Sequence, residues 1–190
     1  MSLWFVSDNG GRIMLVVNLF GAPGAGKSTG AAYIFSRLKM LGINAELVTE
    51  FAKDKVWENN QEALSNQTYM FGKQCYRISR CADKVDVIVT DSPLLLSALY
   101  NNSELLGESF NDLVAKVSKS YDSVNYFIER VKPYNQAGRL QNERESDLLV
   151  GKLKGLLTKY NIDYKTQKGN TAGYDNIVYD VLKETLNNDT

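Results

Sequence analysis

The sequence predicts an α/β fold in which one domain is built on a five-stranded parallel sheet with helices on both faces. Two observations predict it. Short apolar runs alternate with segments of helical spacing along the chain, which is the pattern of strand–helix–strand crossovers. The first of these runs, IMLVVNLF at residues 13–20, ends at a glycine, as expected of a central strand that is covered on both faces. A composition of 44% hydrophobic and 23% charged residues over 190 positions fits one globular domain.

The amino-terminal half supplies three of the strands. After the run at 13–20, helical spacing over 28–41 stops at Gly42, the residue type that most often closes a helix. The run VDVIVT at 85–90 predicts another buried strand. The expected elements up to residue 100 are strands at 13–20, 44–49 and 85–90 and helices at 28–41, 51–58, 65–84 and 94–100.

The carboxyl-terminal half continues the alternation after one interruption. Residues 132–142 are polar and contain Pro133 and Gly138, which predict a loop. No repeat, low-complexity tract or linker breaks the chain, so residues 14–190 are expected to form a single domain, with residues 1–13 as an amino-terminal extension. The remaining expected elements are strands at 124–128 and 164–166 and helices at 108–120, 143–160 and 174–186.

Composition and charge exclude several classes of function. Basic and acidic residues both number 22, so no global field attracts nucleic acid, and only a local basic patch could do so. The sequence has no histidine, which excludes Ser-His-Asp and Cys-His catalysis and leaves a carboxylate, a lysine or a tyrosine as the general base. Cys75 and Cys81 are predicted to be free thiols. No run is long enough to span a membrane and no signal peptide is recognisable, so we expect a cytoplasmic protein without a membrane partner.

One motif carries the functional prediction. The stretch GAPGAGKS at 21–28 matches G-x-x-x-x-G-K-[ST], and it lies between a predicted strand and a predicted helix, as the motif requires. Its glycines let backbone N–H groups form an anion-binding concavity, to which the following helix adds its positive end. The motif predicts a P-loop NTPase fold that binds ATP and Mg²⁺. The residues expected to hold ATP are Gly21, Ala22, Pro23, Gly24, Ala25, Gly26, Lys27, Ser28 and Thr29.

Two carboxylates follow predicted strands and are expected at the same edge of the sheet. Asp91 follows the strand at 85–90, and we expect it to ligate Mg²⁺ with the Ser28 hydroxyl or to take a proton from an attacking hydroxyl group. The alternative for Asp91 is a helix cap across Pro93. Glu50 follows the strand at 44–49 and is expected to bind the acceptor or to act as general base, the alternative being a carboxylate that favours a helix start. The sequence leaves open which of the two is the base.

Basic residues suggest contacts with the transferred phosphate and with the substrate. Arg77 and Arg80 lie on a helical stripe with Lys73 and Lys84, and they are candidates for substrate binding, the alternative being a solvated face. The loop at 132–142 and the residues beside it are expected to form a mobile lid. The lid residues proposed here are Arg139 and Arg144, which would close over the reaction as catalytic residues, and Tyr134, which would stack on a base.

Four segments together resemble a known family. GAPGAGKST, TEFAKD after the second strand, TDSP after the third, and KPYNQAGRLQNERESD as a lid are similar to small phage-type P-loop kinases and NadR-like ATPases. Within that group the chain is most similar to bacteriophage 5-hydroxymethyluracil DNA kinases. The resemblance covers roughly residues 14–186. It implies a nucleotide-kinase-like fold with a lid, in the cytoplasm of the host if a phage encodes the protein.

The sequence therefore predicts a P-loop kinase that transfers the γ-phosphate of ATP to an alcohol group. Lys27, Asp91, Glu50, Arg139 and Arg144 are the expected catalytic residues. The resemblance implies that the acceptor is the hydroxymethyl group of hydroxymethyluracil in phage DNA. Two alternatives stay open, a kinase for a free nucleoside, nucleotide or ribosylnicotinamide, and an ATPase that acts as a switch.

Overall fold

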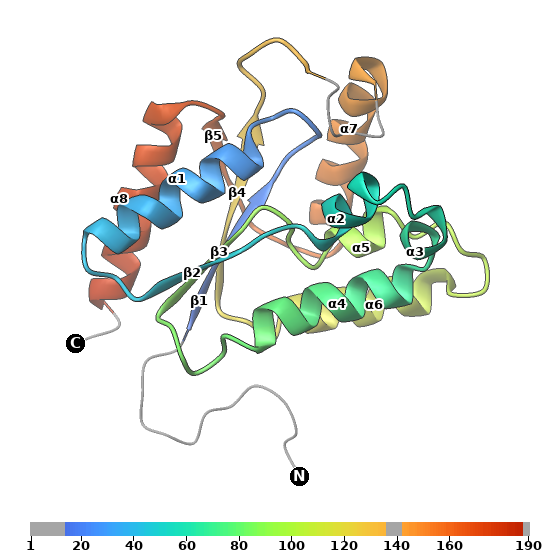
Figure 1. Ribbon diagram of the computed structural model, residues 1–190, viewed down its shortest axis with the longest axis horizontal. Coiled ribbons are helices and arrows are strands. Elements are labelled where there is room, and N and C mark those ends of the chain that lie inside the picture. The colour runs from blue at the N-terminus through green and yellow to red at the C-terminus, as the bar shows by residue number, and fades with distance from the viewer. Residues whose placement is uncertain (1–13, 136–141, 188–190) are drawn as a thin grey trace.

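The computed structural model describes residues 14–135 and 142–187. It contains a five-stranded sheet in the order β2-β3-β1-β4-β5, in which all pairings are parallel (Figure 1). The predicted α/β fold is confirmed, and each of the five expected strands is present. The strands are β1 (Leu15–Phe20), β2 (Ala45–Val48), β3 (Val87–Thr90), β4 (Ser123–Glu129) and β5 (Lys165–Lys168).

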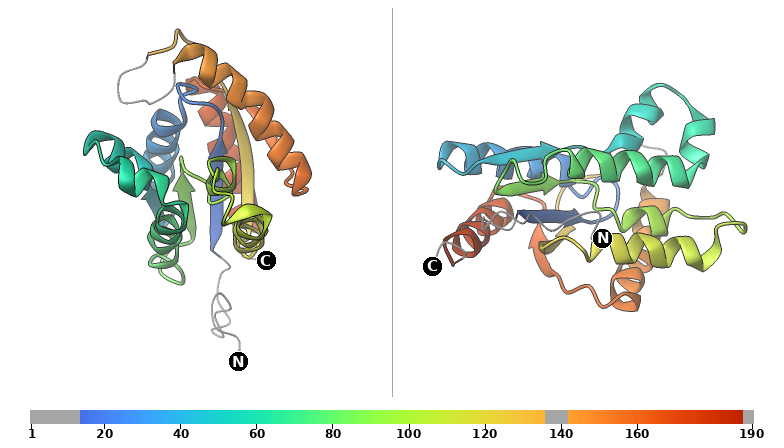
Figure 2. Two further views of the ribbon diagram at one scale, coloured as in Figure 1. Left: turned by 90° about the vertical axis from the view of Figure 1, so that its right-hand side faces the viewer. Right: turned by 90° about the horizontal axis from the view of Figure 1, so that it is seen from below.

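Strand β1 lies at the centre because both of its faces are apolar. Leu15, Val17 and Leu19 belong to the core that the sheet shares with α1 (Lys27–Met40) and α8 (Thr171–Asn187). Val16 and Phe20 point the other way, into the core beneath the remaining helices. The odd-numbered and even-numbered residues of β1 thus pack against two different helical layers, which Figure 2 shows on either side of the sheet.

The second layer contains most of the helices between β2 and β5. The predicted helix at 65–84 is shorter in the structure: it starts at Gln67, where the Asn66 side chain accepts a hydrogen bond from the Tyr69 amide, and it ends at Ser79. The short helix before it, at 61–65, was not predicted. Helix α8 begins three residues earlier than predicted, where the Asn170 side chain accepts from the Gly173 amide. The helices are α2 (Phe51–Trp57), α3 (Gln61–Ser65), α4 (Gln67–Ser79), α5 (Leu96–Leu99), α6 (Gly107–Ser118) and α7 (Glu143–Lys159).

The strand order determines which loops meet. Strand β1 pairs with β3 on one side and with β4 on the other, so the segment after β1 is flanked by the ends of both neighbours. Glu50 follows β2, Asp91 follows β3 and Arg130 follows β4, all at the carboxyl edge of the sheet, where α/β folds bind ligands. No helix within the described ranges is long and apolar enough to cross a membrane. The expected extension over 1–13 lies outside the described residues.

Candidate functional site

The segment between β1 and α1 has the geometry of an anion cradle. The backbone dihedral φ is 146° at Gly21, 80° at Gly24 and 102° at Gly26, values in the left-handed region that favours glycine. Helix α1 starts directly afterwards at Lys27, with no side-chain cap and no acidic residue in its first turn. The first amide groups of α1 are therefore not capped by a side chain, and its positive end is not neutralised. Both features fit the phosphates of a nucleotide.

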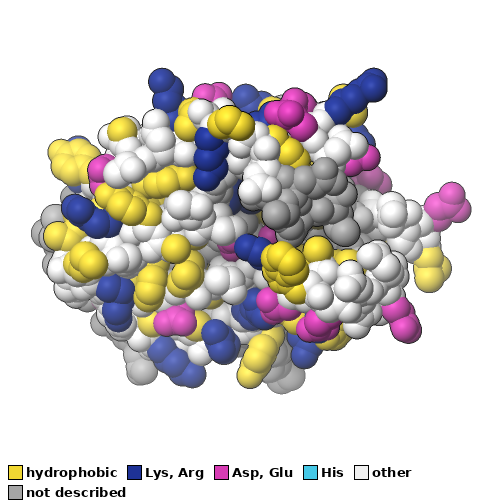
Figure 3. Space-filling view, turned by 45° about the horizontal axis from the view of Figure 1, so that its top comes forward, with side chains coloured by type: hydrophobic (Ala, Val, Ile, Leu, Met, Phe, Trp, Pro, Cys, Tyr) yellow, Lys and Arg dark blue, Asp and Glu magenta, His cyan; other side chains and the backbone are white. Residues whose placement is uncertain are grey.

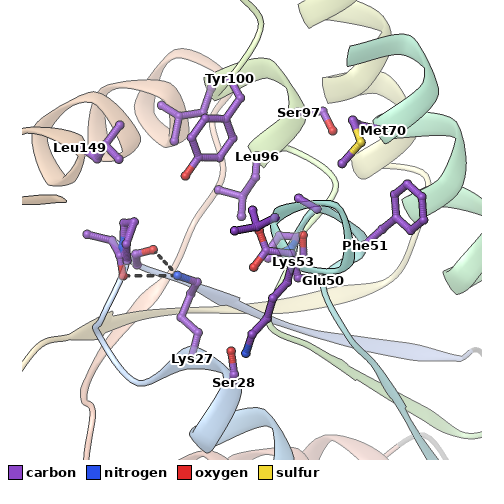
Figure 4. A pocket seen from close by; sticks show the side chains of 18 of the residues that line it. Lys27, Ser28, Glu50, Phe51, Lys53, Met70, Leu96, Ser97, Tyr100 and Leu149 are labelled. Carbon is purple, nitrogen blue, oxygen red and sulfur yellow. Dashed lines mark hydrogen bonds between the residues drawn. The ribbon is translucent and has the colours of Figure 1, made fainter. Parts of the chain in front are cut away.

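The Lys27 side chain lies over this loop. Its ammonium group donates hydrogen bonds to the carbonyl oxygens of Gly21 (2.8 Å) and Ala22 (3.3 Å), which Figure 4 draws as dashed lines. Ser28 and Thr29 follow on the first turn of α1, and both are exposed and line the same cleft. The lysine and the hydroxyl that the motif requires thus face one space.

Three segments from the carboxyl-terminal half pack against the loop. The Ser146 hydroxyl of α7 donates to the Pro23 carbonyl oxygen at 2.8 Å, and Ser146 is fully buried. The Tyr174 hydroxyl of α8 donates to the Gly26 carbonyl oxygen at 2.9 Å. The Tyr134 ring, over which the Arg130 guanidinium lies, packs so closely that a Cβ on Gly24 would come within 2.8 Å of it. The loop shape is therefore held from outside as well as by its own glycines.

Gly169, between β5 and α8, makes the closest of these approaches, and it allows a test. A Cβ at this position would collide with the Ala25 carbonyl oxygen of the loop. We expect Gly169→Ala to lower stability by about 1–3 kcal/mol, because overpacking forces the backbone to shift. It should also weaken ATP binding, since the segment that must shift carries the phosphate-binding amides. Thermal unfolding and titration with ATP measure both effects.

Gly151 on α7 gives the control for that substitution. A Cβ there would meet no atom within 4 Å. Gly151→Ala should therefore leave ATP affinity unchanged. Equal ATP affinity in Gly169→Ala and Gly151→Ala would contradict the predicted contact between the β5–α8 turn and the phosphate loop.

The cleft continues from the phosphate loop into a pocket that the helices α2 to α5 and α7 enclose. The whole cleft, phosphate loop included, has a volume of about 400 Å³. Its walls combine apolar and aromatic side chains with polar ones, and Glu50 lies where the pocket joins the phosphate loop (Figure 4). Such a space suits a planar or apolar molecule that presents one polar group to the loop. The large apolar and aromatic residues of the wall are Phe51, Trp57, Leu64, Met70, Leu96, Leu99, Tyr100, Leu149 and Leu153.

The two carboxylates lie together at this junction. The Glu50 amide donates to Asp91 Oδ1 at 3.0 Å, and Asp91 is only 4% exposed. Burial raises the pKa of Glu50 above its usual 4.5, while the Lys27 ammonium acts in the opposite direction. The Lys27 charge acts on Glu50, and Asp91 contacts the Glu50 backbone; of the two carboxylates, only Glu50 is among the residues that line the cleft. Asp91 lies directly behind Glu50, at the end of β3.

Sequence reasoning missed two residues of the cleft. Tyr100, at the end of α5, points into the cleft in Figure 4, and burial together with the Glu50 carboxylate raises its pKa to about 12. Lys53, in the first turn of α2, also lines the cleft. Lys53 lies one helical turn after Glu50, and that spacing could have indicated it. Nothing in the sequence near Tyr100 marked it, since its position depends on how α5 packs.

The structure does not bring Arg77 and Arg80 to the cleft. Arg77 pairs with Asp54 at 2.5 Å, and its guanidinium lies 5.1 Å above the centre of the Phe51 ring, so it joins α4 to α2. Arg80 is exposed at the end of α4.

Of the three candidate lid residues, Arg144, Tyr134 and Arg139, the two that the structure describes do not share one location. Arg144 is exposed on the first turn of α7 and is not among the residues that line the cleft. Tyr134 packs on the phosphate loop, as described above. Arg139 lies outside the described residues.

The donor set fits a magnesium ion better than a transition metal. Within the described ranges, no cluster of three or more histidine, cysteine or acidic side chains is arranged to hold a metal. Mg²⁺ needs only one or two protein oxygens when it also binds nucleotide phosphates. The Ser28 hydroxyl, on the first turn of α1, and the Asp91 carboxylate, directly after β3, could supply them. On the face shown in Figure 3, Lys and Arg side chains are interspersed with Asp and Glu side chains.

Comparison with known proteins agrees with this geometry. A family model described as AAA domain (AAA_28) matches residues 16–172. No curated protein matches the chain. A crystal structure of thymidylate kinase from Ehrlichia chaffeensis is similar, with a TM-score of 0.58 and 14% sequence identity, over 90% of this chain and 98% of that one. A NadR protein in complex with NAD and AMP-PNP is similar with a TM-score of 0.65 and 16% identity, over 91% of this chain. The match spans 50% of the NadR chain, and these identities show the fold alone.

Proposed function

The protein belongs to the AAA_28 family of AAA domains, and on that premise we propose that it transfers the γ-phosphoryl group of ATP to a hydroxyl group. Its fold is that of P-loop nucleotide kinases. The observation that carries the proposal is the continuity of the cleft. The phosphate loop and the pocket between the helices form one cleft of about 400 Å³, and a partly buried carboxylate, Glu50, lies where the two parts join.

The residues of the cleft have separate roles in this proposal. The loop amides and Lys27 hold the β and γ phosphates, and Ser28 and Asp91 hold Mg²⁺, which neutralises phosphate charge when it is bound. Glu50 accepts the proton of the acceptor hydroxyl, because its raised pKa suits a general base better than that of an ordinary glutamate. The acceptor oxygen bonds to the γ-phosphorus, and the bond from that phosphorus to the bridging oxygen of ADP breaks. Positioning and charge stabilisation supply most of the rate.

We propose that the acceptor is a heterocyclic base or nucleoside that carries an alcohol group. Aromatic side chains in the wall of the pocket support this proposal, since Trp57 and Tyr100 offer faces for a planar ring. The sequence resemblance favours 5-hydroxymethyluracil in DNA. Trp57, which is 65% exposed, would then contact a base presented from a nucleic acid strand.

A free nucleoside or nucleotide is the second candidate. The mixed charges on the surface in Figure 3 favour it, because proteins that bind DNA usually present a basic face. One of the similar structures is a thymidylate kinase, and that enzyme is named for a nucleotide acceptor.

A panel of acceptors tests the proposal. The protein is incubated with Mg²⁺ and ATP labelled at the γ position, together with hydroxymethyluracil DNA, unmodified DNA, nucleosides, nucleoside monophosphates or ribosylnicotinamide. Label on hydroxymethyluracil DNA alone would support the DNA acceptor, and label on a free nucleoside or nucleotide would replace it. Label released only as inorganic phosphate would contradict the kinase assignment in favour of an ATPase.

A further inference from the structure

Two of the cations in the described part of the cleft have no role in the mechanism above. Three positively charged side chains line the described part of the cleft, namely Lys27, Lys53 and Lys132. Lys27 is bound to its own loop, and Lys132 lies in the segment between β4 and α7. Lys53 belongs to α2, on the acceptor side, and in Figure 4 its side chain extends from that helix toward Ser28.

Lys53 differs from its neighbours on α2 in its contacts. Asp54 pairs with Arg77 at 2.5 Å, and Lys55 pairs with Glu58 at 2.6 Å. Within residues 14–135 and 142–187, Lys53 makes no hydrogen bond and no ion pair, and it is exposed to the cleft. An ammonium group on a flexible stem is thus available to a ligand, and forming the new contact would not require an existing ion pair to break.

The position of Lys53 follows from Glu50. Helix α2 begins at Phe51, directly after Glu50, so Lys53 lies in its first turn, beside the carboxylate. The charge of Lys53 lowers the pKa of Glu50, while burial raises that pKa by more. The ammonium group of Lys53 is therefore close enough to Glu50 for the two charges to interact. The phosphate loop approaches that space from the opposite side with Lys27 and Ser28.

We propose that Lys53 is a further catalytic residue, which contacts the transferring phosphoryl group from the acceptor side. This inference rests on the proposed function. In the transfer, the acceptor oxygen bonds to the γ-phosphorus, its proton passes to Glu50, and the electron pair of the breaking bond leaves with ADP. Lys53 keeps its protons and forms no covalent bond, but neutralises charge on the equatorial oxygens. No arginine is among the described residues that line the cleft, so Lys53 supplies a charge that an arginine supplies in many P-loop enzymes.

Lys53→Met tests this role, with Lys53→Arg as the conservative variant and Lys116→Met, an exposed lysine of α6 outside the cleft, as the matched control. At saturating ATP and acceptor, Lys53→Met should lower kcat about 10²-fold, the loss seen when one donor to a transition-state oxygen is removed. Affinity for a non-hydrolysable ATP analogue should change about threefold or less, because an exposed charge contributes little to ground-state binding. Lys53→Arg should recover most of kcat. A wild-type kcat in Lys53→Met would overturn the proposal.

A second measurement separates this role from the proposed function. If the wild-type protein transfers phosphate to no acceptor in the panel, the proposed function fails, and binding of Mg²⁺, ADP and aluminium fluoride decides the role of Lys53. This mixture mimics the planar phosphoryl group. Wild-type protein and Lys116→Met should bind ADP more tightly with aluminium fluoride than without it, and Lys53→Met should lose that gain. Equal gains in all three proteins would refute a contact between Lys53 and the phosphoryl group.

Discussion

Lys27→Ala is expected to reduce phosphoryl transfer about 10³-fold, near the upper end of what the loss of one preorganised donor costs. The ammonium donates hydrogen bonds to the carbonyl oxygens of Gly21 and Ala22, at the site where the phosphates are expected. Its removal therefore takes charge from the reacting group and leaves both hydrophobic cores intact. Label transfer from ATP measures the effect, and thermal unfolding checks that the protein is folded.

Lys39→Ala provides the comparison for this variant. Lys39 lies in the last turn of the same helix and is exposed, far along α1 from the loop. The loss of a cation at a helix end costs about 0.3–1 kcal/mol of stability, and transfer should be unchanged. Transfer by Lys27→Ala at the rate of Lys39→Ala would show that the reaction takes place elsewhere.

Glu50→Gln is expected to have the second large effect, a fall in kcat of about 10²- to 10⁴-fold, which is the usual contribution of a general base. The side chain keeps its size, so the pocket retains its shape and ATP affinity should be preserved. The transfer rate of the wild-type protein should also fall as the pH decreases through the raised pKa of Glu50, because only the carboxylate can accept the proton. A rate that is independent of pH in that range would contradict Glu50 as the general base.

The same substitution should leave stability equal or higher at pH 7. Since burial raises the pKa of Glu50, the folded protein binds this proton more tightly than the unfolded chain does. Stability therefore falls as the pH rises from the unfolded pKa, near 4.5, through the folded value, and glutamine removes this loss. Melting curves of both proteins should converge below pH 4.5. Glu62→Gln, an exposed carboxylate on α3, should show neither effect.

The sequence predicted the parts of the fold that depend on local pattern. The strand at 85–90 was recognisable because it is apolar, and the phosphate loop because its glycines and Lys27 are adjacent in the chain. Helix α3 was not predicted, because it has only five residues and a single side-chain cap at Asn66, rather than a change in hydrophobic pattern, separates it from α4. Strand ends also placed Glu50 and Asp91 at one edge, since parallel strands end together.

The basic residues could not be predicted in the same way. Helical spacing places Arg77 on a stripe, but it does not reveal that Asp54 lies opposite and pairs with it. Nor does any pattern indicate that α5 directs Tyr100 into the cleft. Both facts depend on how helices that are separate in sequence pack against one another. Periodicity therefore identified cationic candidates without determining which of them face a ligand.

The hydrogen bond from Ser146 to Pro23 ties a motif of the amino-terminal end to a residue more than a hundred positions later. A glycine-rich turn loses much conformational entropy when it becomes ordered. Here that loss occurs during folding, when α7, α8 and the β5–α8 turn pack against the turn, and not when nucleotide binds. Changes that unfold or remove the carboxyl-terminal third of the chain should consequently lower the affinity for nucleotide. An isolated βα fragment that carries the complete GAPGAGKST sequence would hold ATP poorly, because it lacks the scaffold that makes the turn rigid.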